Sequence, residues 1–163
     1  MFTDQDRKNI MQLKEVARGT GLLLPSHIIA GGFFSSIYWN VEPKDIDFFF
    51  LDGKSFTLGH SEIKEHNVEY LKNPMIEKVV SVNGTMNQFI YTKYKTRKEL
   101  IDHFDMLHCC VSYDSAEDKL YISPAALHAI KTKTIRPNGS KNISQWRIDK
   151  MLERGWKLET VSV

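Results

Sequence analysis

The chain has 163 residues and a formal net charge of +2 at pH 7, with 42% hydrophobic and 26% charged residues. These values are typical of one soluble globular domain with its own core, and the small net charge gives no argument by itself for nucleic-acid binding. No apolar run approaches the roughly 20 residues that span a bilayer, and the polar N-terminus does not resemble a signal peptide. We therefore expect one domain over residues 1–163, with no membrane contact, in the cytoplasm.

The N-terminal third predicts two helices and two strands. A capped helix over about residues 3–17 is followed by a short strand over residues 27–30. A glycine pair, Gly31–Gly32, then turns this strand into a short helix over about residues 34–39. Residues 44–51 form a second strand that is strongly apolar, so we expect it to lie in the core.

The rest of the chain predicts a hairpin, further strands and three helices. Residues 52–74 are polar and give no clear assignment, and Asn83–Gly84 is a strong hairpin signal. The expected elements are strands over residues 76–82, 86–94, 106–111 and 120–122 and helices over residues 96–104, 123–133 and 142–154. Such a mixture indicates an α+β fold, a mixed β-sheet of about five strands flanked by helices.

The two cysteines of the chain, Cys109 and Cys110, are adjacent. Neighbouring side chains of a strand face opposite sides, so a structural disulfide between them is not expected. We predict two free, partly buried thiols, which suits a reducing cytosol.

The glycine pair can bind phosphate. Neither residue has a Cβ, so the backbone can come close to a ligand, and the free N–H groups at the start of the next helix can bind an anion. Ser35 and Ser36 add hydroxyl groups nearby. The alternative is a purely structural turn, so the glycine pair indicates a phosphate site only when it is taken together with the next strand.

Two aspartates, Asp45 and Asp47, lie in the second apolar strand. Alternate residues of a strand point to the same face, so the two carboxylates would lie side by side. An unpaired buried charge is costly, and a divalent cation such as Mg²⁺ is the natural partner of two converging carboxylates. The turn would then hold phosphates, and the strand would hold the metal at their edge.

A two-metal centre, with ions about 3.5–4 Å apart, usually recruits a third carboxylate. Asp105 is the best candidate, because it immediately precedes a predicted strand and has apolar neighbours in the sequence. The alternatives are that Asp105 is a surface residue at a helix end, or that Asp102 on the preceding helix takes the role.

The Gly31–Gly32 turn, the short helix and the Asp45-Ile46-Asp47 run together resemble the signature of the DNA polymerase β-like nucleotidyltransferase superfamily. The match is similar in style to the head of tRNA nucleotidyltransferases and poly(A) polymerases. The stretches over residues 87–90, 104–106 and 147–156 resemble small single-domain nucleotidyltransferase-like proteins of large tailed bacteriophages, which would place the chain in the host cytoplasm. The signature covers about a quarter of the chain.

This resemblance implies a nucleotidyltransferase fold and an enzyme that transfers a nucleoside monophosphate from an NTP to a hydroxyl acceptor. The expected acceptor is an RNA or tRNA 3′ end, with a protein or a small molecule as alternatives. The implied cofactors are two Mg²⁺ or Mn²⁺ ions. Asp45, Asp47 and Asp105 would be the catalytic metal ligands.

The resemblance also implies which residues bind the phosphates of the nucleotide. The backbone of Gly31–Gly32 would hold the β- and γ-phosphates. The superfamily also has serine at the position of Gly32, so here a hydroxyl contact has to come from Ser35 or Ser36, or is missing.

Basic residues gather near the C-terminus. Arg147, Lys150 and Arg154 recur at three- and four-residue spacing and share one face of the last predicted helix. We assign Lys131, Arg147 and Lys150 to a triphosphate or an RNA backbone. A solvated basic surface is the alternative reading.

Two other functions fit parts of this pattern. A non-catalytic module with the nucleotidyltransferase fold would bind nucleotide, RNA or a host protein without turnover, and the position of Asp105 discriminates it from an enzyme. A glycosyltransferase also places Asp-x-Asp after a hydrophobic strand, but the chain is short for that fold and the nearby Gly31–Gly32 turn is left unexplained.

Overall fold

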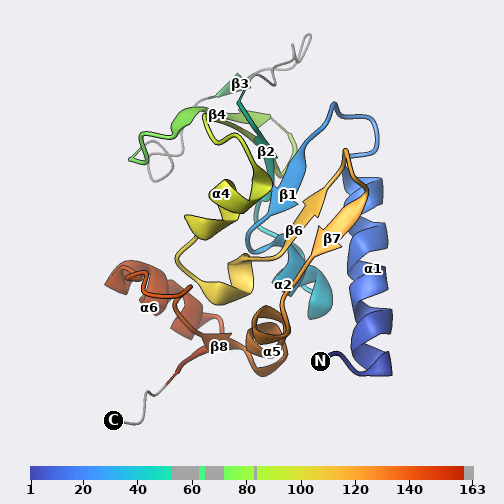
Figure 1. Ribbon diagram of the computed structural model, residues 1–163. Helices are drawn as coiled ribbons and strands as arrows, with labels where there is room; N and C mark the ends of the chain where they lie inside the picture. Colours follow the sequence, from blue (N-terminus) through green and yellow to red (C-terminus); the bar gives the residue numbers. More distant parts are fainter. Residues whose placement is uncertain (53–62, 65–71, 83, 160–163) are drawn as a thin grey trace.

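The computed structural model describes residues 1–52, 63–64, 72–82 and 84–159, with the backbone alone for residues 63–64. The expectations for residues 53–62 and 65–71 and for Asn83 lie outside this part. The helices and strands (Figure 1) are α1 (Asp4–Thr20), β1 (Ile28–Ala30), α2 (Phe33–Tyr38), β2 (Ile46–Phe50), β3 (Ile63–Lys64), β4 (Ile76–Val82), β5 (Asn87–Thr92), α4 (Arg97–Asp102), the 3₁₀ turn η1 (Leu107–Cys109), β6 (Ser112–Asp114), β7 (Lys119–Tyr121), α5 (Pro124–Thr132), β8 (Thr134–Ile135), α6 (Gln145–Glu153) and β9 (Lys157–Leu158).

One mixed sheet organises the chain. Its seven strands lie in the order β3-β4-β5-β2-β1-β6-β7, and β8 and β9 form a separate parallel pair. The β2 strand pairs with β5 in parallel, whereas its other neighbour, β1, is antiparallel and also pairs with β6. The α+β fold with a mixed sheet and flanking helices is confirmed. The sheet has seven strands rather than about five, and the short edge strand β3 lies in the stretch that the sequence left unassigned.

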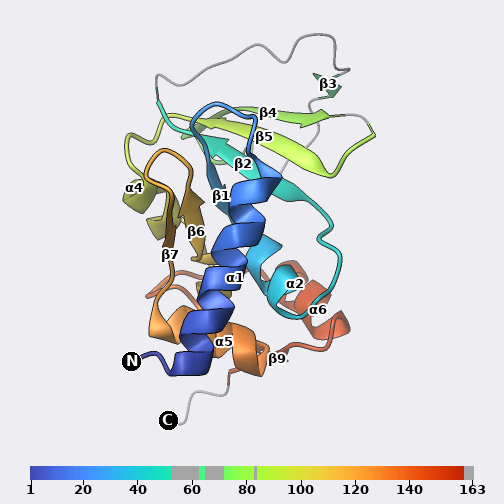
Figure 2. The same cartoon turned by 90° about the vertical axis from the view of Figure 1, so that its right-hand side faces the viewer.

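Helices cover both faces of this sheet. Side chains of α1, α2 and α5 share one buried cluster with Phe48 and Phe50, and side chains of α4 share the other with Phe49. In Figure 2, α1 lies in front of the sheet and α4 behind it. All three phenylalanines are buried. A strand covered on both faces reads as a continuous apolar run, which explains the composition of β2.

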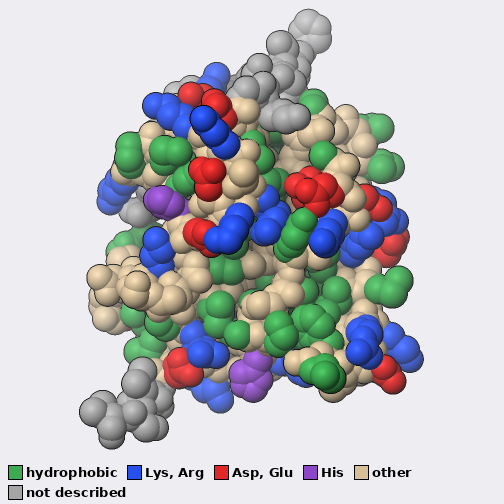
Figure 3. All heavy atoms as spheres, viewed as in Figure 1, with side chains coloured by type: hydrophobic (Ala, Val, Ile, Leu, Met, Phe, Trp, Pro, Cys, Tyr) green, Lys and Arg blue, Asp and Glu red, His purple; other side chains and the backbone are tan. Residues whose placement is uncertain are grey.

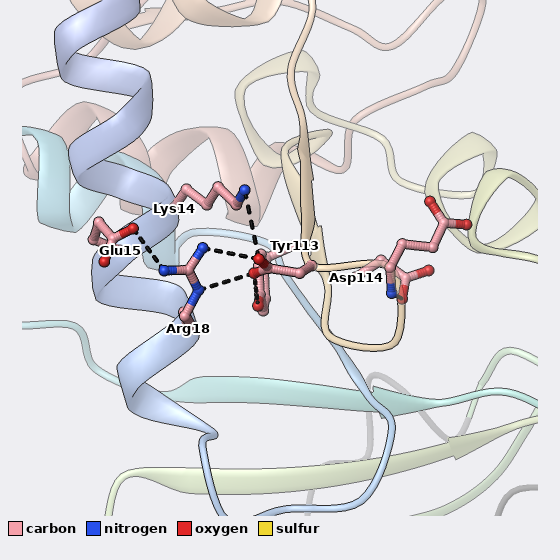
Figure 4. A network of polar contacts seen from close by, with 7 residues as sticks. Lys14, Glu15, Arg18, Tyr113 and Asp114 are labelled. Atoms are coloured by element: carbon pink, nitrogen blue, oxygen red, sulfur yellow. Dashed lines mark hydrogen bonds and ion pairs between the residues drawn. The ribbon is translucent and has the colours of Figure 1, made fainter.

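A polar cluster fixes α1 against the β6–β7 turn (Figure 4). Arg18 donates through Nε and Nη2 to the two carboxylate oxygens of Asp118, each at 2.9 Å, and the hydroxyl of Tyr113 donates to Asp118 at 2.7 Å. These hydrogen bonds lower the pKa of Asp118 to about 2. Because Arg18 and Asp118 are 100 residues apart in the chain, this is a tertiary contact that holds α1 to the β6–β7 turn.

The expected strand over residues 106–111 is wrong. Leu107–Cys109 form the 3₁₀ turn η1, in which the N–H groups of Cys109 and Cys110 donate to the carbonyls of Met106 and Leu107. The N–H of Leu107 donates instead to the carbonyl of Arg136 at 2.9 Å. Local bonds and a distant segment therefore take the backbone groups that a sheet would use. Met106 forms only an isolated bridge with Pro137, and pairing within the large sheet begins at Ser112.

The helices and the strands β1, β2, β4, β5 and β7 follow the predictions within a few residues, whereas the short strands β3, β8 and β9 were not expected. Thr3 and Asp6 form a capping box at the start of α1, and Thr96 and Ser123 cap α4 and α5 through their hydroxyl groups. None of the helices in the described part of the chain has the length and apolar composition needed to cross a bilayer.

Candidate functional site

The glycine turn lies directly beside the carboxylate of Asp47. Gly31 has φ +92°, a conformation that costs other residues strain, and its N–H donates to the carbonyl of Cys109 at 3.3 Å. A Cβ added to Gly31 would lie 3.8 Å from Oδ2 of Asp47. This closeness follows from the sheet, because Ala30, the residue before the turn, is the direct partner of Asp47.

Gly32 has a different environment. It caps α2 with φ −69°, is exposed, and has no described atom within 4 Å of the position of an added Cβ. The turn therefore needs a glycine at position 31 for its backbone, whereas position 32 leaves open space in front of the helix.

The two aspartates of β2 differ in burial. Asp47 is half-buried within the strand, and Asp45 is exposed and lies one residue before it. Ile46 between them is buried in the cluster on the α1 and α2 side of the sheet, as expected if both carboxylates point to the other face. Gln88 on β5 is paired in register with Asp47 and is buried. Reasoning from the sequence did not identify this amide, although a polar residue inside an apolar strand was its signal.

Asp105 lies in a bend between α4 and η1, not at the start of a strand. Its Oδ2 accepts a hydrogen bond from Nη1 of Arg147 on α6 at 2.7 Å, and the two side chains are 20% and 39% exposed. Its backbone is fixed separately, because the N–H of Asn138 donates to its carbonyl at 2.8 Å. The carboxylate thus has an arginine partner, while the main chain beneath it is held in place.

The pKa of the Cys109 thiol is strongly shifted. Burial raises this pKa to about 12; the Arg147 cation opposes this shift, and the nearby charges of Asp105 and Asp47 add to it. These two aspartates do not complete a cluster, since no group of three His, Cys, Asp or Glu side chains among the described residues is placed to hold a metal ion.

The donor set fits one hard cation. Mg²⁺ prefers oxygen ligands and is commonly held by one or two carboxylates together with substrate phosphates and water. Asp47 supplies such a carboxylate beside the glycine turn, and Asp45, one residue before the strand, is exposed. A second ion would require Asp105, whose Oδ2 accepts from Arg147 in this structure.

The other predicted phosphate ligands are distributed around the molecule. Oγ of Ser35 donates to the carbonyl of Gly32 within α2, and the side chain is buried, whereas Ser36 is half-buried. Lys131 forms an ion pair with Asp6 at 2.9 Å and thereby joins α5 to α1. Lys150 is exposed, with Nζ 5.5 Å from the centre of the Trp146 ring.

Of the three basic residues, only Arg147 contacts a predicted metal ligand. On the face seen in Figure 3, Lys and Arg side chains are interspersed with Asp and Glu rather than gathered into one basic patch.

The two thiols are free, as expected. Burial raises the pKa of Cys110, like that of Cys109, to about 12. Because the reactive species is the thiolate, we expect iodoacetamide at pH 8 to modify both cysteines at least about tenfold more slowly in the folded protein than in urea. Mass spectrometry of a labelling time course measures the two rates, and equal rates would contradict the burial of the thiols.

Comparison with known proteins gives a family and a fold. The model of a family described as "Gad2: Gabija anti-defense 2 family protein" matches residues 5–133, well over half of the chain. No curated protein matches the sequence.

Several solved structures share the fold. A tRNA-processing enzyme with CTP aligns with TM-score 0.58 and 18% identity, over 90% of this chain and 43% of that one. The Thermotoga maritima CCA-adding enzyme complexed with tRNA_CCA gives TM-score 0.56 and 14% identity, over 95% and 40%. An apo CCA-adding enzyme gives TM-score 0.58 and 13% identity, over 97% and 41%.

At these identities the likeness shows the fold, and the expected nucleotidyltransferase fold is confirmed. The chain spans about two fifths of the length of these structural neighbours.

Proposed function

The chain belongs to the Gabija anti-defense 2 family, and from this membership and the geometry of the site we propose that it counters Gabija defence as a metal-dependent nucleotidyltransferase. It would transfer a nucleoside monophosphate from an NTP to a hydroxyl group. An RNA 3′ end is the first candidate acceptor, and a protein hydroxyl is the next. The observation that carries the proposal is the closeness of the Gly31 turn to the carboxylate of Asp47. Oδ2 of Asp47 lies 3.8 Å from the position that a Cβ added to Gly31 would take.

The two parts of the candidate site, the Gly31–Gly32 turn and the aspartates of β2, would have separate roles. Asp45 and Asp47 would hold Mg²⁺, and the backbone at Gly31–Gly32 would receive the β- and γ-phosphates, because a turn without Cβ atoms admits a bulky anion. When bound, Mg²⁺ supplies positive charge that neutralises the phosphate oxygens. In the reaction the acceptor oxygen forms a bond to the α-phosphorus, the bond from that phosphorus to the β-phosphate oxygen breaks, and pyrophosphate leaves. The chain contributes mainly position and charge.

One observation favours a second candidate, a nucleotide-binding module without turnover. Asp105 accepts a hydrogen bond from Arg147 and does not join Asp45 and Asp47 in a three-carboxylate group among the described residues. With only two carboxylates, the site would bind a nucleotide with one ion and lack the ligand of a second. The anti-defence activity would then rest on capturing a nucleotide, an RNA or a protein.

A transfer assay separates the two candidates. The protein is incubated with each NTP, labelled at the α-phosphate, together with Mg²⁺ or Mn²⁺ and a lysate of cells that carry Gabija. We expect label in RNA or in a protein band. Binding of the labelled NTP without any labelled product would support the second candidate, and neither binding nor transfer would contradict both.

A further inference from the structure

A cavity of about 500 Å³ lies between α1 and the end of α2. The two helices are adjacent in Figure 2, and the cavity is at the end of α2 that is away from the Gly31–Gly32 turn. Its lining residues come from α1, from the last turn of α2 and from the two residues that follow α2. A cavity of this volume can hold a small ligand or one part of a larger ligand.

The cavity has an apolar floor and an aromatic wall. Leu13 is buried, and Ile37 packs on the same hydrophobic cluster. The rings of Tyr38 and Trp39 pack edge to face, with their centres 5.3 Å apart. Nε1 of Trp39 donates to the carbonyl of Ile130 at 2.8 Å, so the ring is held in place although it is 40% exposed. The wall therefore offers a planar ligand a fixed aromatic surface.

Side-chain amides surround this wall. Asn9 and Gln12 are three residues apart on α1 and so lie on one side of that helix. Asn40 follows α2 in a left-handed conformation, with φ +56°. Oδ1 of Asn9 accepts from the amide of Gln5, whereas the side-chain amides of Gln12 and Asn40 have no hydrogen bond within the part of the chain that the structure describes. An amide offers a donor and an acceptor side by side, which is how Asn and Gln bind the edge of a nucleobase.

A lysine adds positive charge beside the aromatic wall. Nζ of Lys133, at the end of α5, lies 4.7 Å from the centre of the Trp39 ring. Among the described residues Lys133 belongs to no ion pair, whereas its neighbour Lys131 is paired with Asp6 at 2.9 Å. One cation matches the single negative charge of a phosphodiester, while a free triphosphate carries several charges and a neutral sugar carries none. The charge therefore favours a nucleic-acid strand.

We propose that this cavity binds one nucleotide of a single-stranded nucleic acid. The base would lie against the aromatic wall, with the amides of Gln12 and Asn40 at its edge. Lys133 would bind the phosphodiester of the same nucleotide. The cavity needs neither Mg²⁺ nor turnover, so the inference goes beyond the proposed transfer reaction and applies equally to a module without turnover. It also favours a nucleic acid over a protein as the partner of the chain.

The test measures binding of fluorescein-labelled hexaadenylate RNA to the full chain by fluorescence anisotropy, in EDTA so that the metal site is not loaded. We expect the wild type to bind this strand, and an unlabelled abasic hexamer to compete much more weakly. Trp39→Ala should weaken binding roughly 10- to 100-fold, as for the loss of one base-stacking side chain. Gln12→Ala changes an exposed side chain and should weaken binding by about 2- to 10-fold, as for the loss of one hydrogen bond.

Trp146→Ala is the matched control. Trp146 is 45% exposed, close to the 40% of Trp39, and Nζ of Lys150 lies 5.5 Å from the centre of its ring. It does not line the cavity. The variant should therefore bind hexaadenylate as the wild type does. Circular dichroism of each variant shows whether the fold is retained, and Gln12→Ala decides the test if Trp39→Ala does not fold.

Three results would overturn the proposal. Absence of hexaadenylate binding by the wild type would leave the exposed Trp39 surface to a protein partner. Equal competition by the abasic hexamer would reduce the contact to charge alone. Equal affinities of Trp39→Ala and Trp146→Ala would place the strand elsewhere. None of these results bears on the transfer reaction, because binding of NTP with Mg²⁺ at the Gly31–Gly32 turn is measured separately.

Discussion

Replacing Asp47 with asparagine is expected to reduce nucleotide transfer by roughly 10²- to 10³-fold, the range seen when one preorganised electrostatic contact to the reacting group is lost. The carboxylate lies beside the Gly31 turn and is the half-buried member of the Asp45–Asp47 pair. Asparagine has the same shape without the charge, so the amide could not balance a divalent cation. The label-transfer assay measures the loss, and thermal unfolding shows whether the fold is kept.

A matched control uses the other end of the same strand. Asp52 follows β2 by two residues and is exposed. Asp52→Asn removes the same charge beyond the far end of β2, away from the glycine turn. Transfer should therefore stay close to that of the wild type. Equal losses in Asp47→Asn and Asp52→Asn would mean that the effect is one of net charge and would refute a metal site at Asp47.

Replacing Gly31 with alanine is expected to destabilise the protein, whereas the same change at Gly32 is not. The φ of +92° at Gly31 is a conformation that L-residues rarely adopt, at a cost of about 1–3 kcal/mol. For a chain of this size the midpoint of thermal unfolding shifts by about 2–4 °C per kcal/mol. Gly31→Ala should also weaken nucleotide binding, because relief of the strain would move the turn that faces Asp47.

Gly32→Ala is the matched control for this prediction. Position 32 has a helical φ of −69° and open space around an added Cβ, so the stability change should stay within about 0.5 kcal/mol. Differential scanning calorimetry of the two variants compares them directly. A larger loss in Gly32→Ala than in Gly31→Ala would contradict the described turn.

Much of the fold could be predicted because local chemistry determines it. The capping residues Thr3, Thr96 and Ser123 each start a helix where the sequence pattern places one. The apolar run of β2 is buried on both faces, and the glycine turn lies beside Asp47 because β1 and β2 pair. These features depend on neighbouring residues or on one antiparallel pair.

The remainder depends on contacts between distant segments. The run after Asp105 has the composition of a strand, but the N–H of Leu107 donates to the carbonyl of Arg136. The local sequence pattern gives no sign of this distant partner. The parallel register that puts Gln88 beside Asp47 joins strands about forty residues apart. The gathering of basic residues near the C-terminus predicts a phosphate contact for Lys131, whereas in the structure this residue forms an ion pair with Asp6, 125 residues away.

We propose that the site between the Gly31 turn and the Asp47 carboxylate binds a nucleotide through a divalent cation. The most direct measurement is calorimetric titration of α,β-methylene NTP analogues into the wild type and into Asp47→Asn, each with Mg²⁺ and with EDTA. We expect binding by the wild type with Mg²⁺, and none in EDTA or in the variant. Equal binding under all four conditions, or none under any, would contradict it.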